Sequence, residues 1–204
     1  MVPAAGMSRR MGRPKALLPF GPAPMVARVV ESLASADCVS PIVVVTGHER
    51  ERVVAVLAAH DVVHVFNAQY ETGEMLSSIQ AGVRAVGSRA GAVVLALADQ
   101  PGVEAATVRS LVGAWRETGA AIVSPLYAGR TGHPVLISSL LFDEILQLGA
   151  GESLKTLMLR HADEIVKLDV TDPAVVVDVD TPTDYQEALR RWDRRSWRDA
   201  AASV

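Results

Sequence analysis

Short runs of continuous apolar residues recur along the chain and are separated by longer segments of helical spacing. The runs are rich in β-branched residues and do not alternate with polar ones, which is typical of strands buried on both faces. A very short strand is also expected at Met1–Val2. The pattern predicts six further strands, Pro41–Thr46, Val62–Phe66, Ala92–Leu97, Ala120–Ser124, Pro134–Ile137 and Ala174–Val179.

The segments between these runs repeat apolar residues every three or four positions, as amphipathic helices do. Helices are predicted over Met25–Leu33, Arg50–Ala59 and Glu104–Thr118, and another begins near Met75. Strands that alternate with helices form parallel sheets covered by helices on both faces. The sequence therefore predicts α/β architecture: a single three-layer α/β/α domain over residues 1–204, Rossmann-like, with a mainly parallel sheet. Residues 190–204 are expected to form a polar, partly disordered tail.

Composition narrows the class of protein. Half of the 204 residues are hydrophobic, and the net charge is −3 with no basic block, which argues against a general nucleic-acid binder. The single cysteine, Cys38, excludes a disulfide framework and a cysteine-based metal cluster. No apolar run approaches the roughly 18–20 residues that span a bilayer. We therefore expect a cytoplasmic protein whose partners include neither nucleic acid nor membrane.

Polar segments with Gly or Pro follow several of the predicted strands. In an open parallel sheet, ligands bind outside the carboxyl ends of the strands. Segments that follow strands are therefore expected to meet along one rim of the sheet. They are AAGMSRRMGRPK (4–15), NAQYETGEMLSSIQAG (67–82), ADQPG (98–102) and DVDTPTDY (178–185).

The first of these segments combines small residues with cations. Gly6 and Gly12 let the backbone approach an anion closely, and Arg10 and Lys15 supply positive charge. The pattern is not the G-x-x-x-x-G-K-[ST] loop, because Lys15 follows Pro14 and no hydroxyl comes next. It predicts a phosphate-binding loop in which Lys15 is partnered by a phosphate and not by a protein carboxylate. A solvated basic loop is the alternative interpretation.

Carboxylates follow two of the apolar runs. Asp99 ends one run, and Pro101 turns the chain there, so Asp99 is placed to hold Mg²⁺ against phosphate oxygens. The alternative is that Asp99 caps the helix that begins near Glu104. Asp178 and Asp180 lie two residues apart and would point to the same side of an extended segment, where one of them is expected to be a second ligand for the cation.

Further features are less specific. Thr181, Pro182 and Asp184 together predict a helix start. Asn67 can both donate and accept hydrogen bonds, as recognition of a base edge requires. His133 lies between Gly and Pro at a strand entrance; a lone histidine is more often structural than catalytic, although this corner constrains the direction of its side chain. The other four histidines show no metal-binding spacing.

Taken together, these motifs resemble those of the MobA/MocA-like nucleotidyltransferases, which act on the molybdenum cofactor and have the GT-A-type nucleotide-diphosphate fold. The resemblance covers nearly the whole chain in the family's order. It rests on Ala4–Phe20 (LAAGxSxRMGxPKxLLPF), on Asn67, Gly73, Ser78, Ile79 and Gly82, on Leu97–Pro101 (LADQP), on Arg130–Val135 (RGHPV with Thr131 inserted) and on Asp178–Tyr185 (DxDTPxDY).

The resemblance implies transfer of a nucleoside monophosphate from an NTP to the phosphate of a pterin, with Mg²⁺ as cofactor and release of pyrophosphate. It implies catalytic roles for Arg10, Lys15 and Asp99, and metal ligation by Asp99 and Asp180. The implied nucleotide contacts are Ala4, Ala5, Gly6, Ser8, Arg10, Lys15, Asn67, Gly73 and Ser78. The implied pterin contacts are Gly132, His133 and Pro134.

The resemblance leaves the nucleotide open. Leu17–Phe20 (LLPF) is similar to the cytidylyl-transferring members, which favours CTP, whereas guanylyl-transferring members usually carry LLxL there. A GTP-dependent guanylyltransferase, or a transferase acting on another small phosphate substrate, is the alternative enzyme. A non-catalytic nucleotide- or cofactor-binding accessory protein is the alternative of another class. A molybdoenzyme or its chaperone is a further expected partner.

Overall fold

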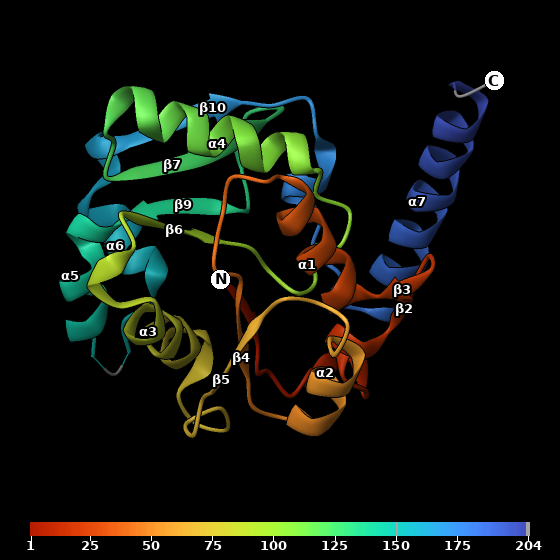
Figure 1. The fold of residues 1–204 in the computed structure, drawn as a ribbon, viewed down its shortest axis with the longest axis horizontal. Coiled ribbons are helices and arrows are strands. Elements are labelled where there is room, and N and C mark those ends of the chain that lie inside the picture. The colour runs from red at the N-terminus through yellow and green to blue at the C-terminus, as the bar shows by residue number, and fades with distance from the viewer. Residues whose placement is uncertain (150, 203–204) are drawn as a thin grey trace.

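A mixed sheet runs through the centre of the molecule in the computed structural model, which describes residues 1–149 and 151–202, with side chains of the last helix as far as Asp193 (Figure 1). Its two halves meet where Met1, directly before β1 (Val2–Ala4), bonds to residues in and next to β6 (Ala92–Leu95): the Met1 amine donates to the Val94 carbonyl (2.8 Å), and the Ala96 N–H donates to the Met1 carbonyl (3.0 Å). In spatial order the strands are β5 (Val63–Phe66), β4 (Val43–Thr46), β1 (Val2–Ala4), β6 (Ala92–Leu95), β9 (Val135–Ser138), β7 (Ile122–Tyr127) and β10 (Ile165–Asp169).

The sheet is mainly parallel, as predicted. β1, β4 and β5 pair in parallel, and so do β7 and β10. β9 runs antiparallel to both of its neighbours, β6 and β7. Two short hairpins complete the strands, one from β2 (Pro19–Phe20) and β3 (Ala23–Pro24), the other between β7 and β8 (Arg130–Thr131).

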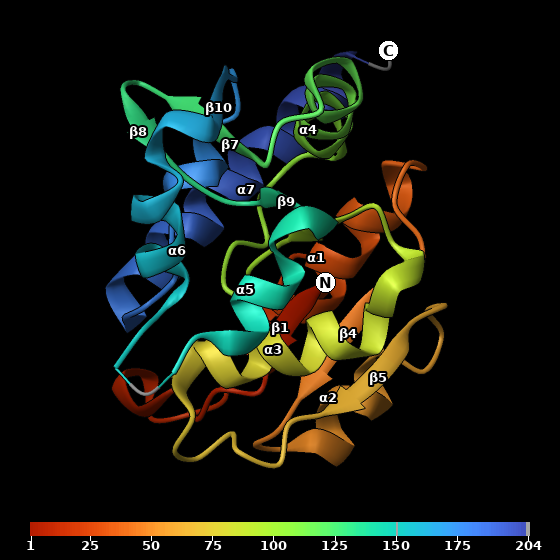
Figure 2. The ribbon, with the colours of Figure 1, turned by 90° about the vertical axis from the view of Figure 1, so that its left-hand side faces the viewer.

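Helices cover both faces of the sheet, which confirms the three-layer arrangement. One face packs against α1 (Met25–Ser35), α2 (Arg50–Val56) and α4 (Ala105–Thr118). The other packs against α3 (Glu74–Val86), α5 (Phe142–Gln147) and α6 (Leu154–Arg160), and α3 and α5 lie side by side (Figure 2).

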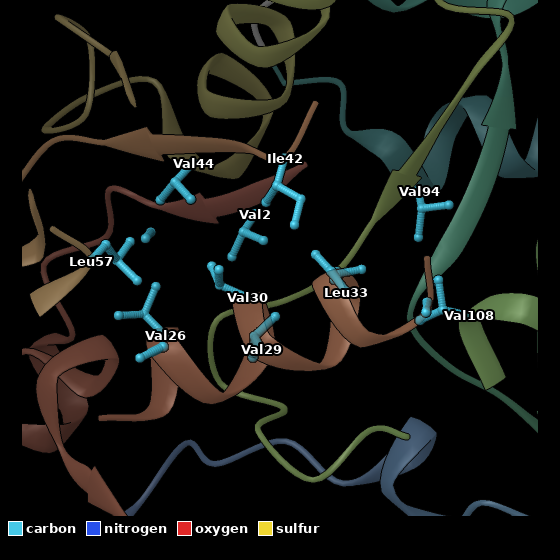
Figure 3. Packing of buried hydrophobic residues seen from close by; sticks show 14 of the residues in the cluster. Val2, Val26, Val29, Val30, Leu33, Ile42, Val44, Leu57, Val94 and Val108 are labelled. Carbon is cyan, nitrogen blue, oxygen red and sulfur yellow. The ribbon is translucent and has the colours of Figure 1, made fainter. Parts of the chain in front are cut away.

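β4, β6, β7 and β9 each supply both cores because successive side chains point to opposite faces. In β4, Val44 joins α1 and α2, whereas Val43 and Val45 join α3. Figure 3 shows the first of these cores, in which Val30 of α1 lies against Val2 of β1. These strands are continuous apolar runs because neither face meets water.

The predicted strand Ala174–Val179 is wrong. Pro173–Val176 forms a 3-10 helix, and the Asp172 side chain caps its start by accepting from the Ala174 N–H (3.0 Å). The strand at this edge of the sheet is β10 instead, which the sequence analysis missed because Lys167 and Asp169 interrupt its apolar pattern. An edge strand keeps one side in water and so tolerates such charges.

The last helix, α7 (Pro182–Ala202), begins where predicted and projects away from the body of the molecule (Figure 1). The Thr181 hydroxyl accepts from the Asp184 N–H (3.2 Å), and the Asp184 carboxylate accepts from the Thr181 N–H (2.8 Å), a reciprocal cap. The segment expected as a tail is helical as far as Ala202. Its partial disorder stays a prediction, and its side chains beyond Asp193 lie outside the described residues.

None of the helices that the structure describes is both long and apolar enough to cross a bilayer.

Candidate active site

A cleft of about 390 Å³ opens at the carboxyl ends of β1 and β6. Three of the predicted segments form its walls: the loop after β1, the turn before α3, and the turn after β6. Asp180, from the fourth segment, completes it. Of the residues predicted to bind nucleotide or metal, those that line the cleft are Ala4, Ala5, Gly6, Ser8, Arg10, Lys15, Ser78, Asp99 and Asp180.

The loop after β1 has a fixed backbone. Arg9–Met11 forms a single 3-10 turn, between Ser8 (φ 51°) and Gly12 (φ 66°), both in the left-handed region where glycine is favoured. The Ser8 hydroxyl accepts from the Lys15 N–H (2.9 Å) and ties the end of the loop to its beginning. The backbone at Lys15 is therefore held, and the orientation of its side chain is set by what surrounds it.

Lys15 lies between two carboxylates. Its Nζ donates to Asp99 Oδ2 (2.7 Å) and to Asp180 Oδ1 (2.8 Å), and Arg10 Nη1 lies 3.0 Å from Asp180 Oδ2. The prediction that Lys15 is not partnered by a protein carboxylate is therefore wrong for the ligand-free protein. The physical reason is that two aspartates converge at the rim, and the lysine ammonium is the closest cation able to neutralise both.

These contacts change the ionisation of the cluster. Burial alone would lower the pKa of Lys15, but the charges and hydrogen bonds of Asp99 and Asp180 outweigh it, and its pKa is raised. The hydrogen bond from Lys15 and the charges of Lys15 and Arg10 lower the pKa of Asp180 despite its partial burial. Lys15 and Asp180 are therefore both charged at neutral pH.

The two aspartates fit a divalent cation. One oxygen of each lies within 2.8 Å of the same nitrogen, so the two carboxylates point at one position. Carboxylate oxygens are the ligands that Mg²⁺ prefers, and two of them balance its charge. Within the described residues no cluster of three or more ligating side chains exists. Mg²⁺ in proteins commonly completes its shell with waters and substrate phosphates, which the open cleft permits.

Asp178 and Asp180 have different surroundings although they lie two residues apart. Asp178 accepts a hydrogen bond from the buried Gln100 (Nε2 to Oδ1, 2.7 Å), whereas Asp180 faces Lys15 and Arg10. The expectation that both point to one side is wrong, because this segment is not a strand. The alternative role for Asp99 as a helix cap is also excluded: Asp172 accepts from the N–H of Glu104 at the start of α4 (2.8 Å).

Two residues predicted to bind nucleotide do not line the cleft. Asn67 is only 4% exposed, and its Nδ2 donates to the hydroxyls of Ser77 (2.8 Å) and Ser78 (3.0 Å) while its Oδ1 accepts from the Gln69 N–H. The hydrogen bonds of its amide are thus made to the turn before α3 and to the first turn of that helix. Asn67 therefore stabilises the segment that carries Ser78, which lines the cleft. Gly73 allows the close approach of Ser77, whose Cβ lies 2.4 Å from where a Cβ at 73 would be.

The predicted pterin contacts do not line the cleft. The His133 N–H donates to the Val175 carbonyl (2.9 Å), and a Cβ on Gly132 would lie 1.9 Å from that oxygen, so the loop is pressed against 173–176. Burial lowers the pKa of His133 despite the charges of Asp178 and Asp99, which keeps its imidazole neutral. Contact of Gly132, His133 and Pro134 with a substrate stays a prediction.

Four residues of segment 67–82, which was expected at the rim, line the cleft but were not among the predicted site residues. They are Tyr70, Glu71, Glu74 and Met75. Glu74 has a positive φ (49°) at the beginning of α3. Their position directly after the carboxyl end of β5 was the available signal, since such segments lie at the rim. The cleft therefore has a cationic wall at Arg9 and Arg10 and an acidic wall at Glu71 and Glu74.

The sequence model of the MobA-like NTP transferase domain matches residues 1–166. The chain belongs to the MobA-like NTP transferase family. This is a nucleotidyltransferase family, and the match includes the cationic loop, the acidic wall and Asp99.

The relatives carry different names. The chain is 32% identical over 185 residues to nicotine blue oxidoreductase of Paenarthrobacter nicotinovorans, covering 87% of this chain and 89% of the relative. It is 25% identical over 193 residues to molybdenum cofactor cytidylyltransferase of Escherichia coli (94% and 95%). The crystal structure of Rv0371c of Mycobacterium tuberculosis in complex with manganese is similar, with a TM-score of 0.76 and 28% identity over 93% of this chain and 96% of that one.

Proposed function

We propose that this nucleotidyltransferase moves CMP from CTP to the phosphate of molybdopterin or the molybdenum cofactor. In this reaction an oxygen of the acceptor phosphate forms a bond to the α-phosphorus of CTP. The bond between the α-phosphorus and the bridging oxygen breaks, and pyrophosphate leaves. The observation that carries the proposal is the convergence of Lys15, Asp99 and Asp180 at one point of the cleft.

Each of these residues has a role that its surroundings support. Transfer of this kind depends on positioning and on neutralising charge more than on covalent catalysis. Arg10 and Lys15 neutralise the triphosphate and the leaving pyrophosphate. Asp99 and Asp180 would hold Mg²⁺, which supplies charge neutralisation at the phosphate oxygens when bound. The manganese complex of the mycobacterial relative supports the use of a divalent cation.

The loop residues would bind the nucleotide through the backbone. Ala4, Ala5 and Gly6 lack large side chains, so phosphate oxygens can approach their N–H groups. Ser8 maintains the loop through its bond to Lys15. The preference for CTP rests on Leu17–Phe20 and on the relative named molybdenum cofactor cytidylyltransferase. We further propose that the protein acts in the cytoplasm.

Fewer observations support the identity of the acceptor than support the binding of the nucleotide. An open groove lined by Tyr127, Arg130, Asp178 and Asp180 adjoins the cleft at Asp180. Arg130 provides a cation for the acceptor phosphate, and His133 borders Asp178. A GTP-dependent or other phosphate-directed transferase, and a non-catalytic accessory protein that serves a molybdoenzyme, remain the competing functions.

Release of pyrophosphate with each of the four NTPs, Mg²⁺ and molybdopterin tests the proposal. We expect release with CTP that depends on both the acceptor and the metal. Release with GTP alone would identify the guanylyl alternative. A thermal-shift screen in which NTPs stabilise the protein, without pyrophosphate release with any acceptor, would favour the accessory protein instead.

A further inference from the structure

The ammonium of Lys15 occupies the position at which the two aspartates converge. Its Nζ lies 2.7 Å from Asp99 Oδ2 and 2.8 Å from Asp180 Oδ1. Mg²⁺ binds oxygen ligands at about 2.0–2.1 Å. A divalent cation bound to both oxygens would therefore lie within the volume of the ammonium group. The two cations exclude one another, and each is an alternative partner for the same carboxylates.

The loop around Lys15 restricts how the lysine can leave. Its backbone N–H is held by the Ser8 hydroxyl (2.9 Å), and Lys15–Leu17 forms a 3-10 turn between Pro14 and Leu18. The backbone is thus anchored on both sides, and the flexible four-carbon side chain is the part that can move. Lys15 lines the cleft, so rotation of its side chain carries the charge into the space that a triphosphate would fill.

A departing lysine needs a new anionic partner. The cationic loop provides none, and the other carboxylates that line the cleft, Glu71 and Glu74, come from the turn before α3 and the start of that helix. A triphosphate in the cleft would offer oxygens next to the loop. Movement of Lys15 to the nucleotide therefore frees Asp99 and Asp180 at the moment when the phosphates arrive, and the metal can then bind to both.

We propose that Lys15 acts as an internal competitor of the divalent cation, so that the metal binds weakly to the free protein and strongly once a nucleotide has drawn the lysine away. This inference rests on the proposed function of the cleft. It assigns to Lys15, besides phosphate binding, a coupling between the nucleotide and the metal. Coupling free energies of this kind typically correspond to factors of about 5–150 in affinity.

Titration of the nucleotide-free protein with Mn²⁺, followed by the electron paramagnetic resonance signal of free Mn²⁺, tests the competition directly. We expect Lys15→Met to bind Mn²⁺ at least about tenfold more tightly than wild type. Lys15→Gln, which keeps a hydrogen-bond donor near the carboxylates, should show the same direction. In both variants, Mn²⁺ alone should raise the unfolding temperature more than in wild type, since a ligand stabilises the state that it binds.

The matched control is Arg9→Met. Arg9 is an exposed cation that lines the same cleft, and no carboxylate partners it among the described residues. If removing a positive charge only changed the general field of the cleft, Arg9→Met and Lys15→Met would raise the Mn²⁺ affinity alike. We expect Arg9→Met to change it less than about twofold, because exposed charges are screened by solvent.

Equal Mn²⁺ affinities of wild type, Lys15→Met and Lys15→Gln, in proteins that unfold cooperatively, would overturn the competition. This result is distinguishable from failure of the proposed function. A protein that binds Mn²⁺ more tightly without Lys15 but releases no pyrophosphate retains the competition and loses the assigned reaction. Normal turnover together with unchanged Mn²⁺ binding retains the reaction and removes the competition.

Discussion

Two clusters of charged side chains differ in how the chain assembles them. In the site, Lys15 contacts Asp99 and Asp180, which are 84 and 165 residues away in sequence. In the second cluster, called the α5–α6 network here, Arg160 and His161 contact Glu144, which is 16 and 17 residues away. The remaining members of the network are Glu152, which pairs with Arg160, and Glu164, which pairs with His161.

The surroundings of the two clusters differ as well. The site cluster faces a cleft, with side-chain exposures of 18% for Lys15, 20% for Asp99 and 33% for Asp180. In the network, Arg160 is 48% exposed and Glu164 59%. The network ties two neighbouring helices together at the surface, where ion pairs contribute little. The site cluster joins three distant segments around an opening, which is the arrangement that permits exchange of partners with a ligand.

Removal of one carboxylate from each cluster should give the largest difference in the rate of pyrophosphate release. Asp99→Ala should lower the rate of metal-dependent pyrophosphate release at least about a hundredfold, since even outer partners of metal ligands contribute about 10–100-fold. Circular dichroism should show an intact fold, because Lys15 retains Asp180. Glu144→Gln in the α5–α6 network is the control and should keep the wild-type rate. Near-wild-type turnover of Asp99→Ala at saturating Mg²⁺ would contradict the assignment of the site.

Substitutions of Asp178 and Asp180, two residues apart, test which of the two aspartates belongs to the site cluster. Asp180→Asn should lower turnover about tenfold or more, because Asp180 shares the convergence point with Asp99. Asp178→Asn should lower it less than about threefold, since an amide oxygen can still accept from Gln100. Steady-state rates over a range of Mg²⁺ concentrations measure both. Equal losses in the two variants would place Asp178 among the metal ligands.

Lys15→Ala is expected to weaken CTP binding about tenfold, since a charge-assisted bond to phosphate is lost. It should also lower the free energy of unfolding of the nucleotide-free protein by about 1–2 kcal/mol, because two partly buried carboxylates lose their shared cation. Lys15→Arg should recover only part of the binding, since a planar guanidinium does not replace a compact ammonium. Calorimetry and denaturant unfolding give the two quantities. CTP affinities that are equal for wild type and Lys15→Ala would exclude a role in phosphate binding.

Much of this architecture could be predicted because it follows from local pattern. The apolar runs of β4, β5, β6, β7 and β9 are each long enough to be recognised, and the segments after them meet at one rim by geometry alone. The reciprocal cap at Thr181 and Asp184 needs only four residues of sequence. Ala174–Val179 failed because composition does not distinguish a buried strand from an apolar loop held by a side chain such as Asp172.

The position of the cleft could be predicted from the sequence, but the contacts between its side chains could not. Small residues and cations identified the loop, and strand ends identified the carboxylates. That Lys15 bridges Asp99 and Asp180 depends on how three distant segments approach one another, which no local pattern records. Asn67 illustrates the same limit: its donor and acceptor groups suggested a ligand contact, whereas the fold turns them toward Ser77 and Ser78.

The smallest expected effect concerns the α5–α6 network and its dependence on pH. Hydrogen bonds to Glu144 and Glu164 raise the pKa of His161 above its ordinary value of 6.5. Because the folded pKa exceeds the unfolded one, the stabilisation is fully present below the unfolded pKa and is lost as the pH rises through the folded pKa. His161→Gln should therefore lower the unfolding temperature slightly at about pH 5.5, and the difference from wild type should fade as the pH rises through the raised pKa of His161.

His48→Gln is the control for this measurement, because the His48 ring lies beside Tyr70 and forms no ion pair with a carboxylate among the described residues. Its difference from wild type should not follow the same pH course. Pyrophosphate release by His161→Gln should equal that of wild type, since the network lies outside the cleft. A stability difference for His161→Gln that grows as the pH rises would show that the neutral imidazole, and not its charge, holds α5 against α6.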